Sequence, residues 1–337
     1  MIRPESILCP RPGGLYCAPG GFYIDPTRPV DRAIITHGHS DHARSGHGAV
    51  LATAETLAIM QARYGDNFAG ATEAVRYGQR VERDGVEIML VPAGHILGSA
   101  QIVIRHKGVT LVVSGDYKRR PDPTCPPFEP VKCDVFVTEA TFGLPVFCFP
   151  ESGHEIAKLI KSAGLFPERT HLVGAYSLGK AQRVIKLLRD AGYDKTIYLH
   201  GAMQSMIELY ERHGIAFGPL APATVDKKKD FEGAIVIAPP TALDDRWTRR
   251  FADPLPAFAS GWMGVRARAR QRHIELPLVI SDHADWHELT HTIAELAPGE
   301  VWVTHGSEEA LLRWCALNNQ KARALHLVGY DEDEGEA

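Results

Sequence analysis

The first third of the chain alternates short apolar runs with polar turns. The runs are four to six residues long and end in turn residues, as is typical of β-strands. They cover residues 21–24, 32–35, 86–91, 100–104 and 109–113. One longer segment, Thr53 to Tyr64, is a helical candidate. We therefore predict a mostly β region that is interrupted by one helix.

In the middle of the chain, strands and helices alternate. The predicted strands lie at residues 171–175, 196–200 and 234–238. Predicted helices at 178–190 and 202–213 separate them. This alternation is typical of parallel strands that are joined by right-handed crossovers. The middle segment is therefore predicted to be an α/β domain of its own.

The last part of the chain is predicted to return to the first region. It has apolar runs at 276–280 and 301–304 with a helix between them at 286–297. We therefore expect a discontinuous domain of residues 1–150 and 273–337, into which residues 151–272 are inserted as a second domain.

One polar cluster stands out directly after the apolar run 33–35. It places three imidazoles and a carboxylate within six residues, namely His37, His39, Asp41 and His42. Imidazole and carboxylate are ligands that zinc and manganese prefer, and a loop leaving a strand can direct them at two neighbouring ions. A polar turn that uses histidines as caps is the alternative. So dense a set of ligand types rarely arises without a metal.

Further polar residues follow other apolar runs. His95 comes after 91–94, Asp116 after 113–115, and Glu139 after 135–138. Each one alone is better explained as a turn or core residue. Together with the histidine cluster, they match the need of a two-metal site for ligands from several strand ends and for a bridging carboxylate.

Composition and charge narrow the class of protein. The chain has 337 residues, 45% of them hydrophobic, which suffices for a full core. Its net charge is -4, yet the predicted insert carries 19 Lys and Arg against 13 Asp and Glu, so the insert is basic. The six cysteines form no C-x-x-C pair, which argues against a zinc ribbon or a disulfide framework.

No apolar run reaches the roughly 18 residues of a membrane span, and the N-terminus lacks the layout of a secretory signal. We expect a cytoplasmic protein without a membrane partner.

The chain resembles the metallo-β-lactamase superfamily and, within it, the β-CASP nucleases. The markers of the superfamily are Asp25 in Y-I-D-P, the H-x-H-x-D-H cluster at 37–42, His95 in P-A-G-H, and Asp116 in S-G-D. The markers of the β-CASP group are Glu139 in T-E-A-T-F-G, His283 in S-D-H, His305 in T-H-G, and the run 175–182. Among β-CASP nucleases, the chain looks most like the bacterial ligase-associated DNA exonucleases, which are relatives of the Artemis-type repair nucleases.

This resemblance implies a fold and a ligand set. The fold is α/β, a metallo-β-lactamase αββα sandwich with an inserted α/β β-CASP cap. The cofactors are two divalent ions, zinc or manganese or both. One ion is held by His37, His39 and His95, the other by Asp41, His42 and His305, and Asp116 bridges them.

Three more roles belong to this interpretation. Asp25 would overcrowd the ions as a further ligand, so we expect its carboxylate to orient a ligand histidine. A cap for the Pro26 turn is the alternative. Asp41, Glu139 and His283 form the expected catalytic set. His283 is the general acid for the leaving oxygen, with Glu139 as its partner. Capping of the following helix by the turn 281–283 is the alternative.

The resemblance also implies a substrate. DNA-processing members carry Val at the position of His305, whereas RNA-processing members carry His, so RNA competes with DNA. Likeness over nearly the whole chain favours a DNA exonuclease in repair that leaves 5′-phosphate and 3′-hydroxyl ends and is functionally associated with a DNA ligase. An RNA-processing nuclease is the alternative. A small-molecule metallo-hydrolase and a non-catalytic binding subunit rank lower.

Two sets of basic residues in the insert are candidates for contacts with the phosphate backbone. In the first set, every second residue is an arginine, so a strand would align these side chains on one face. The set consists of Arg266, Arg268, Arg270 and Arg272. The other set recurs at helical spacing beside a turn at Gly179 and consists of Lys180, Arg183 and Lys186. An ordinary solvated face explains both sets equally well.

Overall fold

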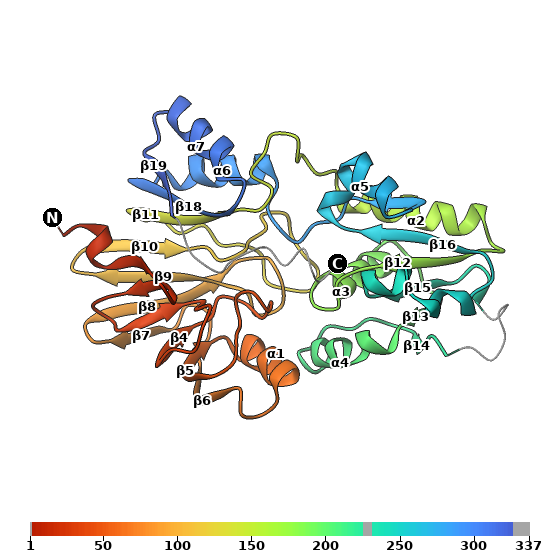
Figure 1. Ribbon diagram of the computed structural model, residues 1–337, viewed down its shortest axis with the longest axis horizontal. Helices are drawn as coiled ribbons and strands as arrows, with labels where there is room; N and C mark the ends of the chain where they lie inside the picture. Colours follow the sequence, from red (N-terminus) through yellow and green to blue (C-terminus); the bar gives the residue numbers. More distant parts are fainter. Residues whose placement is uncertain (1, 225–230, 326–337) are drawn as a thin grey trace. The chain divides into compact units, whose positions relative to one another are not determined.

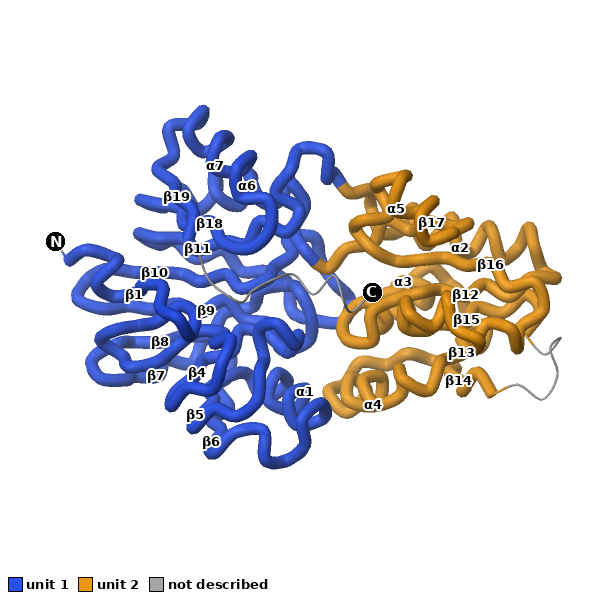
Figure 2. Tube along the Cα trace, in the orientation of Figure 1, with its two compact units in different colours: residues 1–148, 283–332 blue, residues 149–282, 333–337 orange. Residues whose placement is uncertain are grey.

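The computed structural model describes residues 2–224 and 231–325 of the chain (Figure 1). These residues form two compact units. Unit 1 contains the chain up to Cys148 and from His283 onward, and unit 2 is Phe149–Asp282 (Figure 2). Both units combine helices with β-sheets, so the predicted α/β class is confirmed. Among the described residues, no helix is both long and apolar enough to cross a membrane.

Unit 1 contains two sheets. The strands of the first, in spatial order, are β1 (Leu8–Arg11), β2 (Gly14–Cys17), β3 (Phe22–Ile24), β4 (Arg32–Ile34), β5 (His47–Ala52) and β6 (Ala69–Ala74). The strands of the second are β19 (Ala322–Ala324), β18 (Glu300–Gly306), β11 (Val135–Ala140), β10 (Val109–Val113), β9 (Ala100–His106), β8 (Val86–Pro92) and β7 (Arg80–Arg83). Its helices are α1 (Ala54–Tyr64), α6 (Trp286–Leu296) and α7 (Glu308–Leu317).

Alternation along the strands explains how these layers pack. Ile34 of β4 packs in one hydrophobic core with Ile88 and Ile102 of the second sheet. Ala33 and Ile35 point the other way, into a cluster with Met60 of α1. The opposite face of the second sheet packs against α6 and α7 in the same manner. The two sheets therefore face each other, and each carries helices on its outer side.

Unit 2 is built around one sheet of six strands. Its order is β14 (Leu220–Pro222), β13 (Ile197–Leu199), β15 (Ile235–Ala238), β12 (Thr170–Gly174), β16 (Pro254–Ala259) and β17 (Leu276–Leu278). Its helices are α2 (Ser152–Leu165), α3 (Lys180–Asp190), α4 (Gln204–Arg212) and α5 (Arg266–Gln271). All neighbouring strands pair in parallel, as the alternation of strands and helices predicted.

One strand lies in a different sheet from the one expected. The run 276–280 was assigned to the first domain, but β17 pairs with β16 of unit 2. The chain returns to unit 1 only at His283. A short apolar run does not specify which sheet edge it joins, because any edge satisfies its backbone hydrogen bonds.

Strand direction gathers the polar residues of unit 1 at one edge. β10, β11 and β18 are mutually parallel. β8 runs in the same direction, because β9 lies antiparallel between β8 and β10. In the other sheet, β3 and β4 are also parallel. Residues at the carboxyl ends of these strands therefore come together, which is where ligands are held in many sheets with parallel strands.

Candidate metal centre

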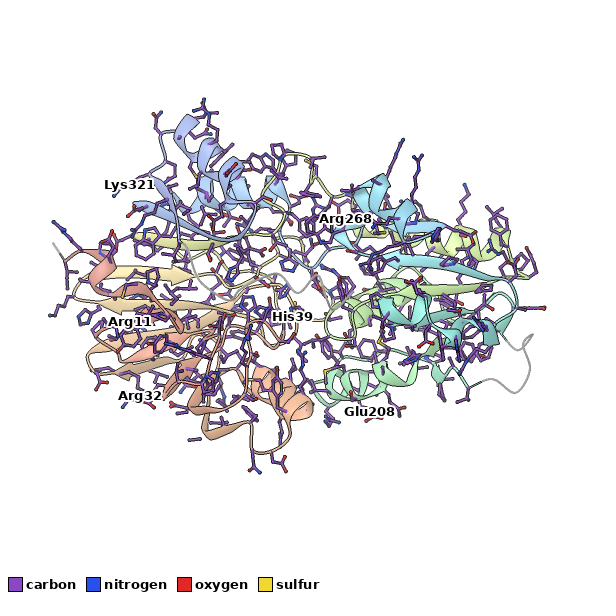
Figure 3. All side chains as sticks on the ribbon, viewed as in Figure 1. Arg11, Arg32, His39, Glu208, Arg268 and Lys321 are labelled. Atoms are coloured by element: carbon purple, nitrogen blue, oxygen red, sulfur yellow. The ribbon has the colours of Figure 1, made fainter. Side chains whose placement is uncertain are left out.

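Four side chains converge on one point at this edge. They are His37, His39, His95 and Asp116, and one ligand atom from each lies within 4.8 Å of the others (His39 is labelled in Figure 3). Nδ1 of His39 is 3.1 Å from Nε2 of His37 and 3.0 Å from Nε2 of His95. Nitrogens held about 2.0–2.1 Å from a tetrahedral zinc ion lie roughly 3.4 Å apart, so this spacing suits one shared cation.

Asp116 connects this group to a second one. Its Oδ2 lies 3.3 Å from Nε2 of His37 and 3.4 Å from Nε2 of His42. The same atom of His42 is 3.4 Å from Oδ2 of Asp41. The ring of His305 lies 5.3 Å from that of His42, measured between centroids. One carboxylate oxygen thus faces two sets of ligand-type side chains, as a bridge between two cations would.

The carboxylate of Asp25 binds the loop that carries the histidines. Its Oδ2 lies 2.8 Å from Nδ1 of His42 and accepts a hydrogen bond from Oγ1 of Thr36 at 2.6 Å. Its Oδ1 accepts the backbone N–H of Thr36 at 2.7 Å. The carboxylate thereby binds the Nδ1 side of the His42 ring, so that Nε2 faces Asp41 and Asp116, the orientation that a metal ligand needs. Sequence reasoning missed Thr36, whose only signal was its place directly before His37.

Two residues of this region adopt an unusual backbone conformation. The φ angles of Asp25 and His305 are 42° and 60°, in the left-handed region that non-glycine residues seldom occupy. Asp and His tolerate this region better than most residues do. Such conformations persist where the surrounding structure holds them, and they concentrate at functional sites.

The charges of the cluster depend on one another. Burial disfavours the charged ring of His42, but the carboxylates of Asp116 and Asp41 outweigh burial and raise its pKa well above the usual range. Burial would likewise raise the pKa of Asp116, but His42 and other nearby imidazoles lower it well below normal. At His305, burial dominates and lowers the pKa to about 4. The anionic Asp116 therefore faces a charged His42 ring and a neutral His305 ring, and a divalent cation would have to displace the proton of His42, because an imidazole binds a metal in its neutral form.

His283 and Glu139 form a pair beside the cluster. Nδ1 of His283 is 3.0 Å from Oε2 of Glu139, and the His283 ring lies 4.6 Å from that of His95, between centroids. Oε1 of Glu139 accepts the backbone N–H of Tyr117 at 2.8 Å. Glu139 thus binds both the ring of His283 and the backbone of the residue that follows Asp116.

The donor set fits divalent metals. It consists of imidazole nitrogens and carboxylate oxygens without thiolate, which suits zinc and manganese alike. The pairing of Asp25 with His42 also matches the outer hydrogen bonds that orient metal-binding histidines. The side chains present can therefore hold cations at this edge.

The arginines expected on a strand lie on a helix instead. Residues 266–271 form α5, because Arg, Ala and Gln favour helices and the run contains no β-branched residue (Arg268 is labelled in Figure 3). The guanidinium of Arg268 stacks 3.9 Å from the ring centroid of Trp262, and that of Arg272 lies 5.4 Å from the ring of Phe258. The four arginines therefore do not share one face.

Lys180 and Arg183 are not available as an exposed phosphate track either. Both side chains are buried in α3. Nζ of Lys180 pairs with Oδ1 of Asp282, and Arg183 donates to the carbonyl oxygen of Ser281. The helical spacing predicted correctly that the two residues lie on one helix. That face of the helix is buried, so their charged groups point into the protein. Their side chains bind the segment that precedes His283.

The chain is similar to proteins that are named as a probable DNA ligase, a ribonuclease and a subunit of a cleavage and polyadenylation specificity factor. No protein-family model matches the chain. A probable DNA ligase of Opitutus terrae is 29% identical over 304 residues, which is 87% of this chain and 28% of the ligase. A ribonuclease of Thermus thermophilus is 28% identical and matches 58% of this chain and 51% of its own. Subunit 3 of the cleavage and polyadenylation specificity factor of Dictyostelium discoideum is 34% identical over 122 residues, 35% of this chain and 16% of the subunit.

The chain thus spans at most about half the length of these relatives. A solved structure of a protein of unknown function from Enterococcus faecalis shares the fold, with a TM-score of 0.58 at 14% identity over 88% of this chain and 79% of the other. The relatives confirm the resemblance that the sequence motifs indicated.

Proposed function

We propose that this chain, a member of the metallo-β-lactamase superfamily related to the β-CASP nucleases, is a metal-dependent phosphodiesterase that cleaves nucleic acid. Unit 1 corresponds to the lactamase-like αββα domain and unit 2 to the inserted cap. The observation that carries the proposal is the position of Asp116 Oδ2, within 3.4 Å of ring nitrogens from both His37 and His42. A small-ester hydrolase has less need of the adjacent Glu139–His283 pair.

The ligand set is proposed residue by residue. His37, His39 and His95 hold one divalent ion, Asp41, His42 and His305 hold the other, and Asp116 serves both. Zinc or manganese bound there supplies Lewis-acid activation of the attacking water and neutralises charge on the phosphate. Asp25 keeps His42 in the required tautomer through the 2.8 Å contact at Nδ1.

His283 is the proposed general acid. Phosphodiester cleavage expels an alkoxide, and a protonated imidazole can donate its Nε2 proton to that oxygen. Glu139, 3.0 Å from Nδ1, stabilises the imidazolium and orients the ring. The products are a 5′-phosphate and a 3′-hydroxyl.

DNA is the proposed substrate, in exonucleolytic repair. The relative that matches 87% of this chain is named as a probable DNA ligase, which also supports a functional association with ligation. RNA is the second candidate, because other relatives are named as ribonucleases and because His305 occupies the last marker position.

The test is an end-resolved assay. The protein is loaded with zinc or with manganese and incubated with 5′- and 3′-labelled DNA and RNA of one sequence, and with a chromogenic ester. We expect shortening of DNA from an end, loss of that activity with a chelator, and slow turnover of the ester. Faster cleavage of RNA would assign the second candidate. Faster turnover of the ester than of either nucleic acid would refute the proposal.

A further inference from the structure

The segment directly after Asp116 hydrogen-bonds to the His283 loop and to its surroundings at several points. The backbone N–H of Tyr117 donates to Oε1 of Glu139, and the carbonyl oxygen of Tyr117 accepts the N–H of Ala284 at 2.6 Å. The backbone N–H of Lys118 donates to the carbonyl of Ala93, two residues before His95. One short segment therefore joins the bridging carboxylate, the His95 loop and the His283 loop.

The side chain of Lys118 adds a buried charge to this connection. Only 2% of the residue is exposed. Its Nζ donates to the backbone carbonyl of His283 at 3.3 Å and lies 3.6 Å from Oε2 of Glu288. Burial of an ammonium costs several kcal/mol before compensation by partners. Replacement of such a buried pair by apolar atoms is often neutral for stability, so stability alone does not explain the ammonium.

Glu288 is itself held rigidly. It forms a capping box with Asp285 at the start of α6, in which each side chain accepts the backbone N–H of the other. Oε1 of Glu288 also accepts the backbone N–H of Arg120 at 2.7 Å, and Arg120 Nη2 lies 2.8 Å from Oδ2 of Asp285. Lys118 therefore connects the His283 carbonyl to a fixed helix start.

His283 is in this way held at two points. Glu139 fixes its ring through Nδ1 at 3.0 Å, and Lys118 fixes its backbone through the carbonyl. Both attachments lead back to the segment that carries Asp116. A side chain with its backbone and its ring both anchored retains few orientations, which is the condition for efficient proton transfer at a fixed distance.

We propose that Lys118 is a positioning residue for His283, and this inference rests on the proposed function, in which His283 protonates the leaving oxygen. In this proposal Lys118 acts through the loop, because its ammonium contacts the His283 carbonyl and Glu288. Its loss should therefore affect the step that needs the proton and spare the steps that do not. A purely structural lysine would affect all steps alike.

The test compares Lys118→Met with wild type on two substrates. One is an ordinary dinucleotide phosphodiester, and the other is a nitrophenyl phosphodiester, whose leaving group needs no proton. We expect kcat to fall about 10- to 100-fold on the first substrate, the size of effect that misplacement by about 1 Å produces, and less than about 3-fold on the second. Metal content and the melting temperature are measured in parallel. Metal content should change little, whereas the melting temperature should fall, because the variant removes one partner of a buried ion pair.

Lys132→Met is the matched control. Lys132 also donates to backbone carbonyls of unit 1, at Glu295 and Leu296, but it is exposed and lies at the other end of α6. This variant should retain both activities. If Lys118→Met does not fold, Lys118→Gln provides the same comparison with a neutral polar side chain. An equal loss on both substrates, or no loss on either, would overturn the inference.

Amide hydrogen exchange gives a readout that is independent of turnover. In Lys118→Met, the amides of residues 283–286 should exchange faster than in wild type, whereas Lys132→Met should leave them unchanged. Unchanged exchange in Lys118→Met would also contradict the positioning role. A wild-type protein that cleaves neither substrate would refute the proposed function, and the exchange data would then decide whether Lys118 holds this loop.

Discussion

Unit 1 and unit 2 use their titratable side chains in opposite ways. In unit 1, three imidazoles and the Asp116 carboxylate turn their ligand atoms toward one another, within 4.8 Å. In unit 2, basic side chains turn toward their own unit, where Lys180 meets Asp282 and Arg268 stacks on Trp262. Burial and the neighbouring imidazoles disfavour a charge on His95, a cost that a bound cation would offset, whereas pairing of a basic side chain with an acid or a ring stabilises unit 2 itself.

This contrast shows why a cluster of histidines and aspartates is better evidence for a binding site than regularly spaced arginines and lysines are. Histidines and aspartates brought together from separate strands have few structural reasons to converge, so their clustering points to a ligand. Arginines and lysines at regular spacing have many such reasons. Of the four arginines at 266–272, Arg266 and Arg270 are exposed, while Arg268 and Arg272 are half-buried over aromatic rings.

The largest effect is expected from the loss of a proposed metal ligand in unit 1. In Asp41→Ala, hydrolysis should fall about 10³-fold or more, because a carboxylate at the proposed second ion is lost together with the charge it contributes. The metal-free protein should melt at nearly the wild-type temperature, since Asp41 is partly exposed and packs in no core cluster. Turnover and metal content are measured on the same sample.

Asp31→Ala is the control for this variant, because Asp31 is an exposed carboxylate just before β4. It should retain both metal and activity. Full turnover and full metal content in Asp41→Ala would show that the convergence in unit 1 does not hold two ions.

A smaller effect is expected at His283. His283→Ala should slow an ordinary phosphodiester by about 10²-fold, the lower range for loss of a general acid, and a nitrophenyl phosphodiester far less. Metal content should be unchanged, because the expected ligands are all other residues. If both substrates slow equally, or if an ion is lost, then His283 belongs to the ligand set, and the cluster extends further than proposed.

The sequence was most informative where local order alone specifies the structure. The helix at 54–64 was predicted correctly, because Thr53 caps it and accepts the N–H of Thr56. The dense run from His37 to His42 could be recognised as a candidate site before any fold was known. The pairing of Asp25 with a ligand histidine was expected, and the structure places Asp25 against His42 at 2.8 Å.

The sequence-based predictions were wrong where tertiary contacts decide which strand pairs or which side chain is buried. The edge joined by β17 depends on which strand is free to pair, and β16 is its partner. The inward turn of Lys180 depends on Asp282, a residue about 100 positions away. The alternation of Arg266 to Arg272 resembled strand periodicity, but helix propensity governs a six-residue segment without β-branched side chains.

The smallest effects are expected from variants of α5 in unit 2. If α5 contacts nucleic acid, the double variant Arg266→Ala/Arg270→Ala should lower the magnitude of the salt slope of binding by about 1.4 on single strands, because each phosphate contact contributes about 0.7. The two residues lie one helical turn apart and are exposed, so stability should not change. Binding is measured by fluorescence anisotropy across a series of salt concentrations.

Arg268→Ala/Arg272→Ala is the matched double variant on the same helix. It removes guanidinium groups that lie over Trp262 and Phe258, so it should lower the melting temperature while it leaves most of the salt slope in place. Each stacking contact is worth about 0.5–1 kcal/mol at a partly exposed site, so the change should amount to a few degrees at most. Equal salt slopes in both double variants and the wild type would exclude α5 from the nucleic-acid contact. A reduced slope only in the second variant would mean that the stacked arginines leave their rings to bind phosphate.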